Sequence, residues 1–175
     1  HRDRTRARRG RRTLTMHDPA PTGAAAVLNG ACPVGGERLL TRGEIALARS
    51  VFGKAVDYAN VTVKRRKFFP LQPRKVTMAP MGHLHFHPGA EHYCDDFSAA
   101  PLHLQAHFIH EMTHVWQAQV LGRWHLVLHR HPWCRYDYAL RPGWKLGRYG
   151  IEQQAEIVRH TFLMRNGAPV AGAPS

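Results

Sequence analysis

His110-Glu111-Met112-Thr113-His114 is the stretch that decides the fold of this chain. One helical turn separates its two histidines, so both imidazoles leave the same face of a helix and can bind one zinc ion. The carboxylate of Glu111 could take a proton from a water that the zinc activates. The motif therefore indicates a zinc-dependent hydrolase with Glu111 as its catalytic residue. The alternative is a buried helix whose histidines are only hydrogen-bonded.

The residues around this motif predict one long helix, from about Ala99 to Leu121. Ser98 is expected to cap its start, and Gly122 is expected to end it. Apolar residues flank the motif at three- and four-residue spacings, namely Ala106, Ile109, Val115, Trp116 and Val120. The motif therefore lies inside a predicted helix.

A catalytic zinc site needs a third protein ligand and an open position for water. Glu152 and Glu156 are the best downstream candidates, because both lie in a run that predicts a second helix. That run has an apolar stripe at helical spacing, formed by Ile151, Ala155, Val158 and Phe162. The two glutamates share a face, so one could ligate zinc while the other orients a ligating histidine. The alternative is a pair of solvated carboxylates on an exposed face.

The two motifs together resemble the gluzincin type of zinc metallopeptidase. In that type, H-E-x-x-H on one helix is followed by E-x-x-x-D or E-x-x-x-E on a second helix. Residues 152–156, which read E-Q-Q-A-E, match the second element. The resemblance implies that Glu152 is the third ligand of one zinc ion, beside His110 and His114. It also implies that Glu156 does not touch the metal but contacts one of its ligands and holds that ligand in place.

Residues 110–117, which read H-E-M-T-H-V-W-Q, are similar to a narrower group. They resemble the short metallopeptidase domains encoded with bacterial polymorphic toxins and contractile injection (type VI) systems, including Vgr-related proteins. Such domains also have an upstream Phe-Gly, here Phe52-Gly53, and a strand like residues 84–89. The resemblance covers about residues 39–165. It implies a protein or peptide substrate and a secretion-system or toxin partner.

The chain as a whole predicts an α+β fold, a small zincin-like domain. Its active helix would pack beside a short mixed or antiparallel sheet, with the second metal-ligand helix near the C-terminus. A capping box at Thr41–Glu44 begins a helix that ends near Gly53, and residues 124–132 fit either a strand or a helical extension. Three strand candidates are Val61–Val63, Lys75–Ala79 and Leu84–His87. The expected organisation is a flexible basic arm (1–36), the metallopeptidase-like domain (37–167) and a loose tail (168–175).

Two segments are expected to border the site. Residues 133–150 are interpreted as a structured loop that covers it. The candidate donors in this loop to the oxyanion, which forms when water attacks a carbonyl, are Tyr136, Tyr138 and Tyr149. In the last strand candidate His83, His85 and His87 alternate, so they would share one face. We interpret His85 and His87 as lining a cleft for extended substrate, with a second metal site or a solvated strand face as alternatives.

The chain has 175 residues and a net charge of +13, and its first twelve residues hold seven arginines and one aspartate. A basic surface suits nucleic acid or another anion, and the cluster Lys64–Lys67 beside Phe68 and Phe69 could touch one. A plain basic loop is the more common explanation of such a cluster. The alternatives to a metallopeptidase are thus a nucleic-acid- or anion-binding module, with a structural zinc or no metal, and a zinc amidase acting on cell wall.

Cysteine spacing and hydropathy bear on the compartment. The three cysteines, Cys32, Cys94 and Cys134, are odd in number and widely spaced, which argues against a disulfide framework. No apolar stretch has the length of a membrane span, and prolines interrupt the run that follows the arginine-rich start. We therefore expect no signal peptide, and either a cytoplasmic location or export through a contractile injection system.

Overall fold

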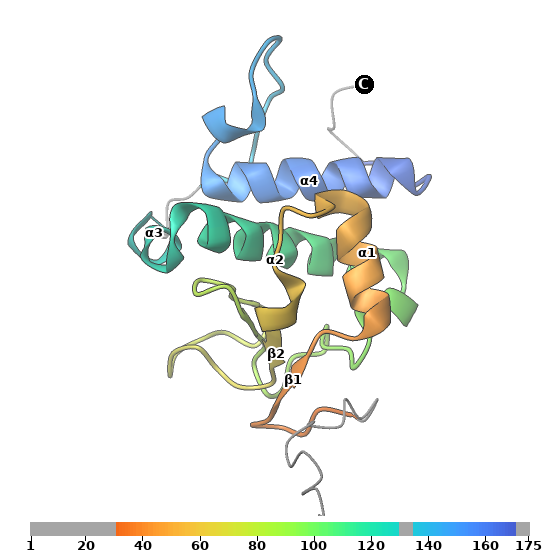
Figure 1. The fold of residues 1–175 in the computed structure, drawn as a ribbon, viewed down its shortest axis with the longest axis vertical. Coiled ribbons are helices and arrows are strands. Elements are labelled where there is room, and N and C mark those ends of the chain that lie inside the picture. The colour runs from red at the N-terminus through yellow and green to blue at the C-terminus, as the bar shows by residue number, and fades with distance from the viewer. Residues whose placement is uncertain (1–30, 130–134, 171–175) are drawn as a thin grey trace, which may run out of the picture.

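Helix α2 (Leu102–Leu121) lies between helix α4 (Ile151–Arg165) and a small sheet in this computed structural model, as Figure 1 shows. The structure describes residues 31–129 and 135–170. The other elements are β1 (Glu37–Leu39), α1 (Arg42–Phe52), η1 (Tyr58–Asn60), β2 (Thr62–Lys64), β3 (Leu84–His85), η2 (Phe97–Ala99), α3 (Arg123–His129) and η3 (Leu146–Arg148). The expected α+β class, with the helix that bears the H-E-x-x-H motif beside a short sheet, is confirmed.

The sheet is mixed, and its three strands follow the order β1-β2-β3. Strand β2 is antiparallel to β1, with Val63 opposite Arg38, and parallel to β3, with Val63 opposite Leu84. The side chains of Val63 and Leu84 are fully buried in the core against which α2 packs. Two of the three predicted strands are thus confirmed, although β2 begins one residue later and β3 ends earlier than predicted.

The strand predicted at residues 75–79 is wrong. A single isolated bridge, from Met78 to His85, is the only ladder contact described for this segment. The amide of Gln72 donates hydrogen bonds to the carbonyls of Val76 and His85, at 2.8 and 3.0 Å. Because a side chain, and not a neighbouring strand, binds the carbonyl of Val76, the segment runs as a loop beside β3 instead of forming a strand.

Helix α2 begins at Leu102 rather than Ala99, and the predicted cap at Ser98 is wrong. Ser98 lies inside η2, where its backbone N–H and its hydroxyl both donate to the carboxylate of Asp96. Proline at position 101 disfavours helical backbone in the residue before it, and residue 100 is extended with ψ 164°. The short extended link separates η2 from α2, which starts without a side-chain cap.

The remaining predicted helices are found. Helix α1 has the expected capping box and ends at Gly53, whose φ of 56° suits glycine, and α4 ends at Asn166. The ambiguous residues 124–132 are helical up to the end of α3, and residues 130–134 lie outside the described part. None of the helices in the described part is both long and apolar enough to cross a lipid bilayer.

The predicted arm and the cysteines are only partly within the described residues. Residues 1–30, 171–175 and Cys134 lie outside them, whereas Cys32 and Cys94 are free thiols. The last residues assigned to the arm contact the domain, because Cys32 N donates to Asp95 and Arg65 donates to Cys32 O. The anchored part of the chain therefore starts before position 37.

An aromatic stack joins α2 to the sheet side of the domain. The Phe97 ring lies between Phe86 and Phe108, with ring centroids 5.4 and 5.3 Å away. All three side chains are fully buried, so the stack combines apolar burial with offset ring contacts. Because Phe108 lies two residues before His110, this packing holds the motif helix in place.

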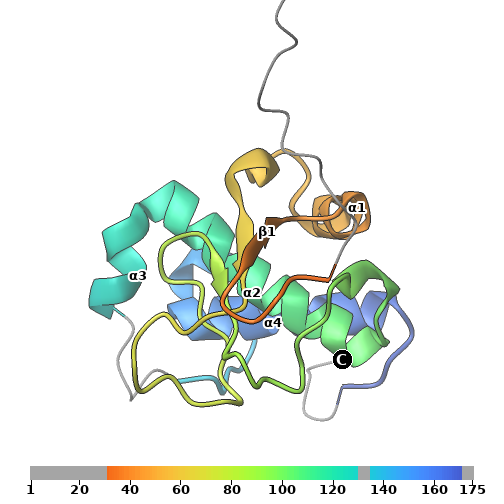
Figure 2. The ribbon, with the colours of Figure 1, turned by 90° about the horizontal axis from the view of Figure 1, so that it is seen from below.

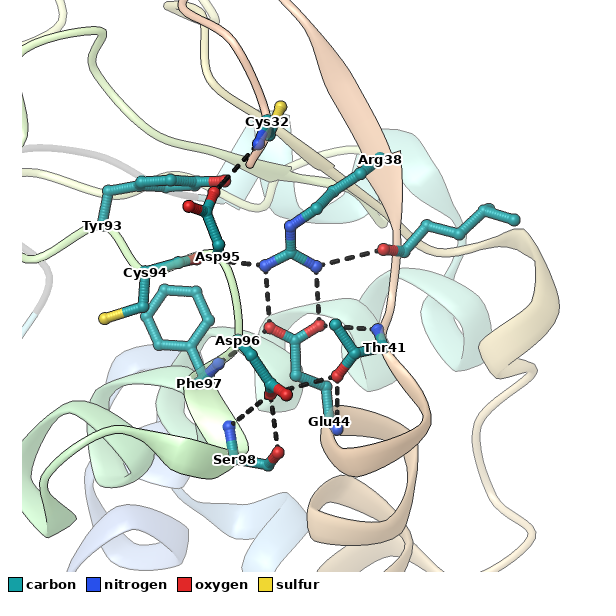
Figure 3. A network of polar contacts seen from close by, with 11 residues as sticks. Cys32, Arg38, Thr41, Glu44, Tyr93, Cys94, Asp95, Asp96, Phe97 and Ser98 are labelled. Carbon is teal, nitrogen blue, oxygen red and sulfur yellow. Dashed lines mark hydrogen bonds and ion pairs between the residues drawn. The ribbon is translucent and has the colours of Figure 1, made fainter. Parts of the chain in front are cut away.

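A buried carboxylate connects β1, α1 and the segment that leads into α2 (Figure 3). The carboxylate of Glu44 accepts two hydrogen bonds from the Arg38 guanidinium, both at 2.8 Å. It also accepts from the backbone N–H of Thr41 at 2.9 Å and of Phe97 at 3.0 Å. The Glu44 side chain has no exposed surface, so these four contacts compensate its charge within the protein.

We expect Glu44→Ala to lower the free energy of unfolding by about 3–5 kcal/mol, because the Arg38 guanidinium loses its buried partner. Glu37→Ala is the control, since the exposed Glu37 carboxylate pairs with Lys64 and Arg66 and its loss should cost about 0–1 kcal/mol. Urea unfolding followed by circular dichroism measures both values. Similar losses in the two variants would contradict the role given to Glu44.

Candidate metal centre

Helices α2 and α4 run antiparallel and side by side (Figure 1), and α4 lies behind α2 when the molecule is seen from below (Figure 2). They bring the predicted ligands together. The ligand atoms of His110, His114 and Glu152 all lie within 4.8 Å of one another. The three residues are 7%, 2% and 1% exposed. Three buried donors this close can hold a metal ion, and no other such group of histidine, cysteine, aspartate or glutamate occurs in the described residues.

Both imidazoles present the same nitrogen to the centre of this group. The Oε2 atom of Glu152 lies 3.2 Å from His114 Nε2 and 3.5 Å from His110 Nε2. The two Nε2 atoms are 3.3 Å apart. Without a cation or a proton between them, two nitrogen lone pairs would face each other at this distance, so the arrangement favours a bound positive charge.

The opposite nitrogen of each imidazole has a partner on the protein side. His110 Nδ1 lies 2.8 Å from Glu156 Oε1, an ion-pair distance without full hydrogen-bond alignment. His114 Nδ1 lies 2.9 Å from Gln117 Oε1. The amide nitrogen of Gln117 donates to Ile151 O and to another side chain, so its oxygen must face His114. Partners of this kind leave Nε2 free for a metal and hold the ring in place.

The charges around His110 favour a cation. Burial acts to lower the pKa of His110, but the carboxylates of Glu152 and Glu156 outweigh burial and raise this pKa to about 9. Burial likewise acts to raise the pKa of Glu156, but contact with His110 and the charge of Arg159 lower it to about 2. The donor set of two imidazoles and one carboxylate also matches the ligands that zinc takes in proteins.

Glu111 lies next to the ligand pair and is 3% exposed. Its Oε2 atom is buried and has no hydrogen-bond partner within residues 31–129 and 135–170. Burial of a carboxylate oxygen without a partner costs several kcal/mol, on the order of the loss of a charged hydrogen bond. Such a group is more typical of a functional site than of a core.

A histidine pair near Glu111 was not predicted from the sequence. Thr77 Oγ1 lies 2.9 Å from His92 Nε2 and 2.8 Å from His107 Nε2. Burial lowers the pKa of His107 to about 4, so this ring is neutral at neutral pH. The four-residue spacing from His107 to Glu111 was a visible signal, because it places both on one face of α2.

The three candidate tyrosines have different surroundings. Tyr136 is exposed, and the hydroxyl of Tyr138 lies 2.8 Å from His160 Nδ1. The buried Tyr149 accepts a hydrogen bond from the backbone N–H of Arg141 at 2.9 Å. A role of any of them beside an oxyanion stays a prediction.

The alternating histidines have separate partners. His83 Nδ1 lies 3.0 Å from the hydroxyl of Thr62, and His87 Nδ1 accepts from its neighbour Gly89 N. His85 is buried at the edge strand β3, against the ring of Phe68. They do not form a metal-binding group of three in the described residues, and a cleft role for His85 and His87 stays a prediction.

Comparison with known proteins places the chain beside a secretion protein. The type VI secretion system spike protein VgrG2b of Pseudomonas aeruginosa is 41% identical over 145 residues, which are 79% of this chain. The match spans only 14% of that spike protein. No protein-family model matches the chain.

A solved structure extends this likeness to the fold. The effector domain of Pseudomonas aeruginosa VgrG2b superposes on this chain with a TM-score of 0.62 and 37% sequence identity. The match covers 79% of this chain and 77% of that domain. Both the sequence and the fold are shared over most of the two chains, and we conclude that this chain belongs to the family of the VgrG2b effector domain.

Proposed function

We propose that this chain is a zinc-dependent metallopeptidase, in which His110, His114 and Glu152 hold the metal. The main support is the orientation of the two imidazoles, whose Nε2 atoms both face Glu152 Oε2 within 3.5 Å. Their Nδ1 atoms contact Glu156 and Gln117, as the outer partners of zinc ligands do. Among the described residues three donors converge, which is typical of a catalytic site with an open position.

Glu111 is the catalytic residue of this proposal. When bound, zinc would polarise the peptide carbonyl and make water more acidic. Glu111 would accept a proton from the attacking water and later deliver it to the leaving amine. No described group competes for its Oε2 atom, and the neighbouring His107 is neutral, so the carboxylate is not held in a salt bridge there.

We further propose that the domain acts on protein or peptide as a bacterial toxin, in partnership with a type VI secretion system. Support comes from the likeness to the effector domain of a spike protein. Because the match covers a small part of that spike, the partner, export through a contractile injection system and toxicity are all proposals for this chain. A zinc amidase acting on cell wall would use the same site on another substrate.

The basic nucleic-acid-binding alternative receives less support. Part of the charge of the 64–67 cluster is compensated within the domain, since Lys64 and Arg66 both pair with the carboxylate of Glu37. Arg65 donates to a backbone carbonyl and its guanidinium lies over the ring of Tyr93. A cluster with these internal contacts presents less free charge to phosphate groups than the sequence suggests.

We expect Glu111→Gln to keep one zinc per chain and to lose peptide hydrolysis by about 10²-fold or more, because the amide cannot accept the proton of the attacking water. Zinc content by mass spectrometry and cleavage of a quenched fluorescent peptide library measure the two properties. A zinc-loaded Glu111→Gln variant with wild-type activity would refute the base role.

Substitutions can separate the role of Glu152, the proposed third ligand, from that of Glu156, which lies one turn farther along α4. We expect Glu152→Gln to abolish tight zinc binding, because it replaces the charged carboxylate donor by a neutral amide oxygen, which is a poor zinc ligand. Glu156→Gln should weaken binding by about 10- to 100-fold while leaving all three ligands present. Competition with a zinc chelator measures both affinities. The opposite ranking of the two variants would make Glu156 the ligand.

A further inference from the structure

Two polar chains run from the candidate metal ligands to the segment 138–149. The first begins at His110, whose Nδ1 lies 2.8 Å from Glu156 Oε1. The other oxygen of Glu156 lies 3.3 Å from His160 Nε2, and His160 Nδ1 lies 2.8 Å from the hydroxyl of Tyr138. Glu156 and His160 are one turn apart on α4, so this helix face directs the chain from the site to the segment.

The second chain reaches the other end of the same segment. His114 Nδ1 lies 2.9 Å from Gln117 Oε1, and Gln117 Nε2 donates to Gln154 Oε1 at 3.0 Å. Gln154 Nε2 then donates to the backbone carbonyl of Tyr149 at 2.8 Å. Gln117 is fully buried and Gln154 nearly so, so these amides have little alternative contact with water. Each candidate imidazole ligand is therefore connected to one end of the segment.

The segment between these two ends has little apolar packing of its own. Residues 139–145 are all exposed, and Trp144 contacts the guanidinium groups of Arg141 and Arg148 within the segment itself. Just before the segment there is another contact with α4, because Gln153 Nε2 donates to Asp137 O at 2.6 Å. The position of the segment thus depends mainly on polar contacts with α4, which is also the helix that bears Glu152.

Arg159 competes with His110 for the carboxylate of Glu156. Arg159 NH1 lies 3.2 Å from one of its oxygens and 3.0 Å from the other, and the Arg159 side chain is half-exposed. Unopposed, this flexible cation could draw the carboxylate away from His110. His160 Nε2 shares the Oε2 atom of Glu156 with Arg159, at 3.3 Å against 3.0 Å, so it is a second contact that can oppose this pull. The hydroxyl of Tyr138 lies on the other side of the His160 ring, 2.8 Å from its Nδ1.

We propose that Tyr138 and His160 are positioning residues that keep Glu156, and through it the His110 imidazole, in the metal-binding orientation. Metal binding and the docking of segment 138–149 on α4 are therefore energetically coupled. The inference rests on the metal site of the proposed function. Because coupling between two equilibria is reciprocal, a bound metal must also strengthen the docking of the segment.

The test measures zinc affinity by chelator competition in the wild-type chain and in Tyr138→Phe and His160→Phe. Groups bonded directly to a ligand change affinity by about 10- to 100-fold, so these more distant variants should weaken binding by about three- to tenfold. Tyr58→Phe is the matched control, because its hydroxyl donates to Gly53 O outside both chains, and it should bind like wild type. Tyr138→Phe removes a single hydroxyl at the end of the surface segment. This variant therefore keeps the test valid if His160→Phe misfolds.

The double variant distinguishes an effect passed from Tyr138 through His160 from a general loss of stability in this part of the protein. If Tyr138 acts through His160, then Tyr138→Phe/His160→Phe should bind zinc no more weakly than His160→Phe alone. Trypsin supplies a second readout, since Lys145 and Arg148 are exposed within the segment and neither precedes a proline. Zinc should slow their cleavage in the wild-type chain, and this protection should shrink in Tyr138→Phe.

The outcomes distinguish the coupling from the metal site itself. A wild-type chain that binds no zinc overturns both the proposed function and this inference. A wild-type chain that binds zinc, with both variants within twofold of it and tryptic cleavage unaffected by zinc, overturns the coupling alone. Weakened binding in the variants, wild-type binding in Tyr58→Phe and non-additivity in the double variant support it.

Discussion

The antiparallel register of α2 and α4 is the constraint on which the site depends. It places His114 beside Glu152 and His110 beside Glu156, so one turn of α2 meets one turn of α4. A shift of α4 by one residue would rotate its glutamates by about 100° around the helix axis. Gln117 fixes the register, because its amide donates both to a backbone carbonyl and to a side chain of α4.

The other side of α2 is fixed by different physical means. The buried Glu44 carboxylate accepts from Arg38, Thr41 and Phe97, and thereby joins strand β1, the start of α1 and the segment before α2. The stacked rings of Phe97 and Phe108 then continue this connection along α2 itself. Charge contacts thus fix the segment before α2, whereas ring, amide and imidazole contacts fix α2 itself.

The sequence was sufficient for features that are local. The four-residue spacings of His110–His114 and Glu152–Glu156, and the capping box of α1, each depend on residues within one turn, and all were predicted. The Ser98 cap and the strand at 75–79 were wrong because Asp96 and Gln72 bind groups that the local pattern left available. The hydrogen bonds of Asp96 and Gln72 cannot be read from the spacing of apolar and polar residues, and they were therefore not predicted.

The missed part of the site shows the same limit. The cluster of Thr77, His92 and His107 joins three segments far apart in the chain, so its convergence depends on the tertiary fold. The connection from Tyr138 to Glu156 likewise depends on how a surface segment lies along α4. Motif spacing predicts which residues can act together on one helix, whereas packing decides which residues from other elements join them.

The metal-binding side chains are divided between two helices, α2 and α4, and this affects when the metal centre can form during synthesis. During synthesis, α2 with its two imidazoles is translated before Glu152 is added to the chain. A nascent fragment that ends before Ile151 has the recognisable histidine motif but an incomplete donor set. A cell that makes this protein therefore encounters the assembled centre only after α4 has been translated and has folded along α2.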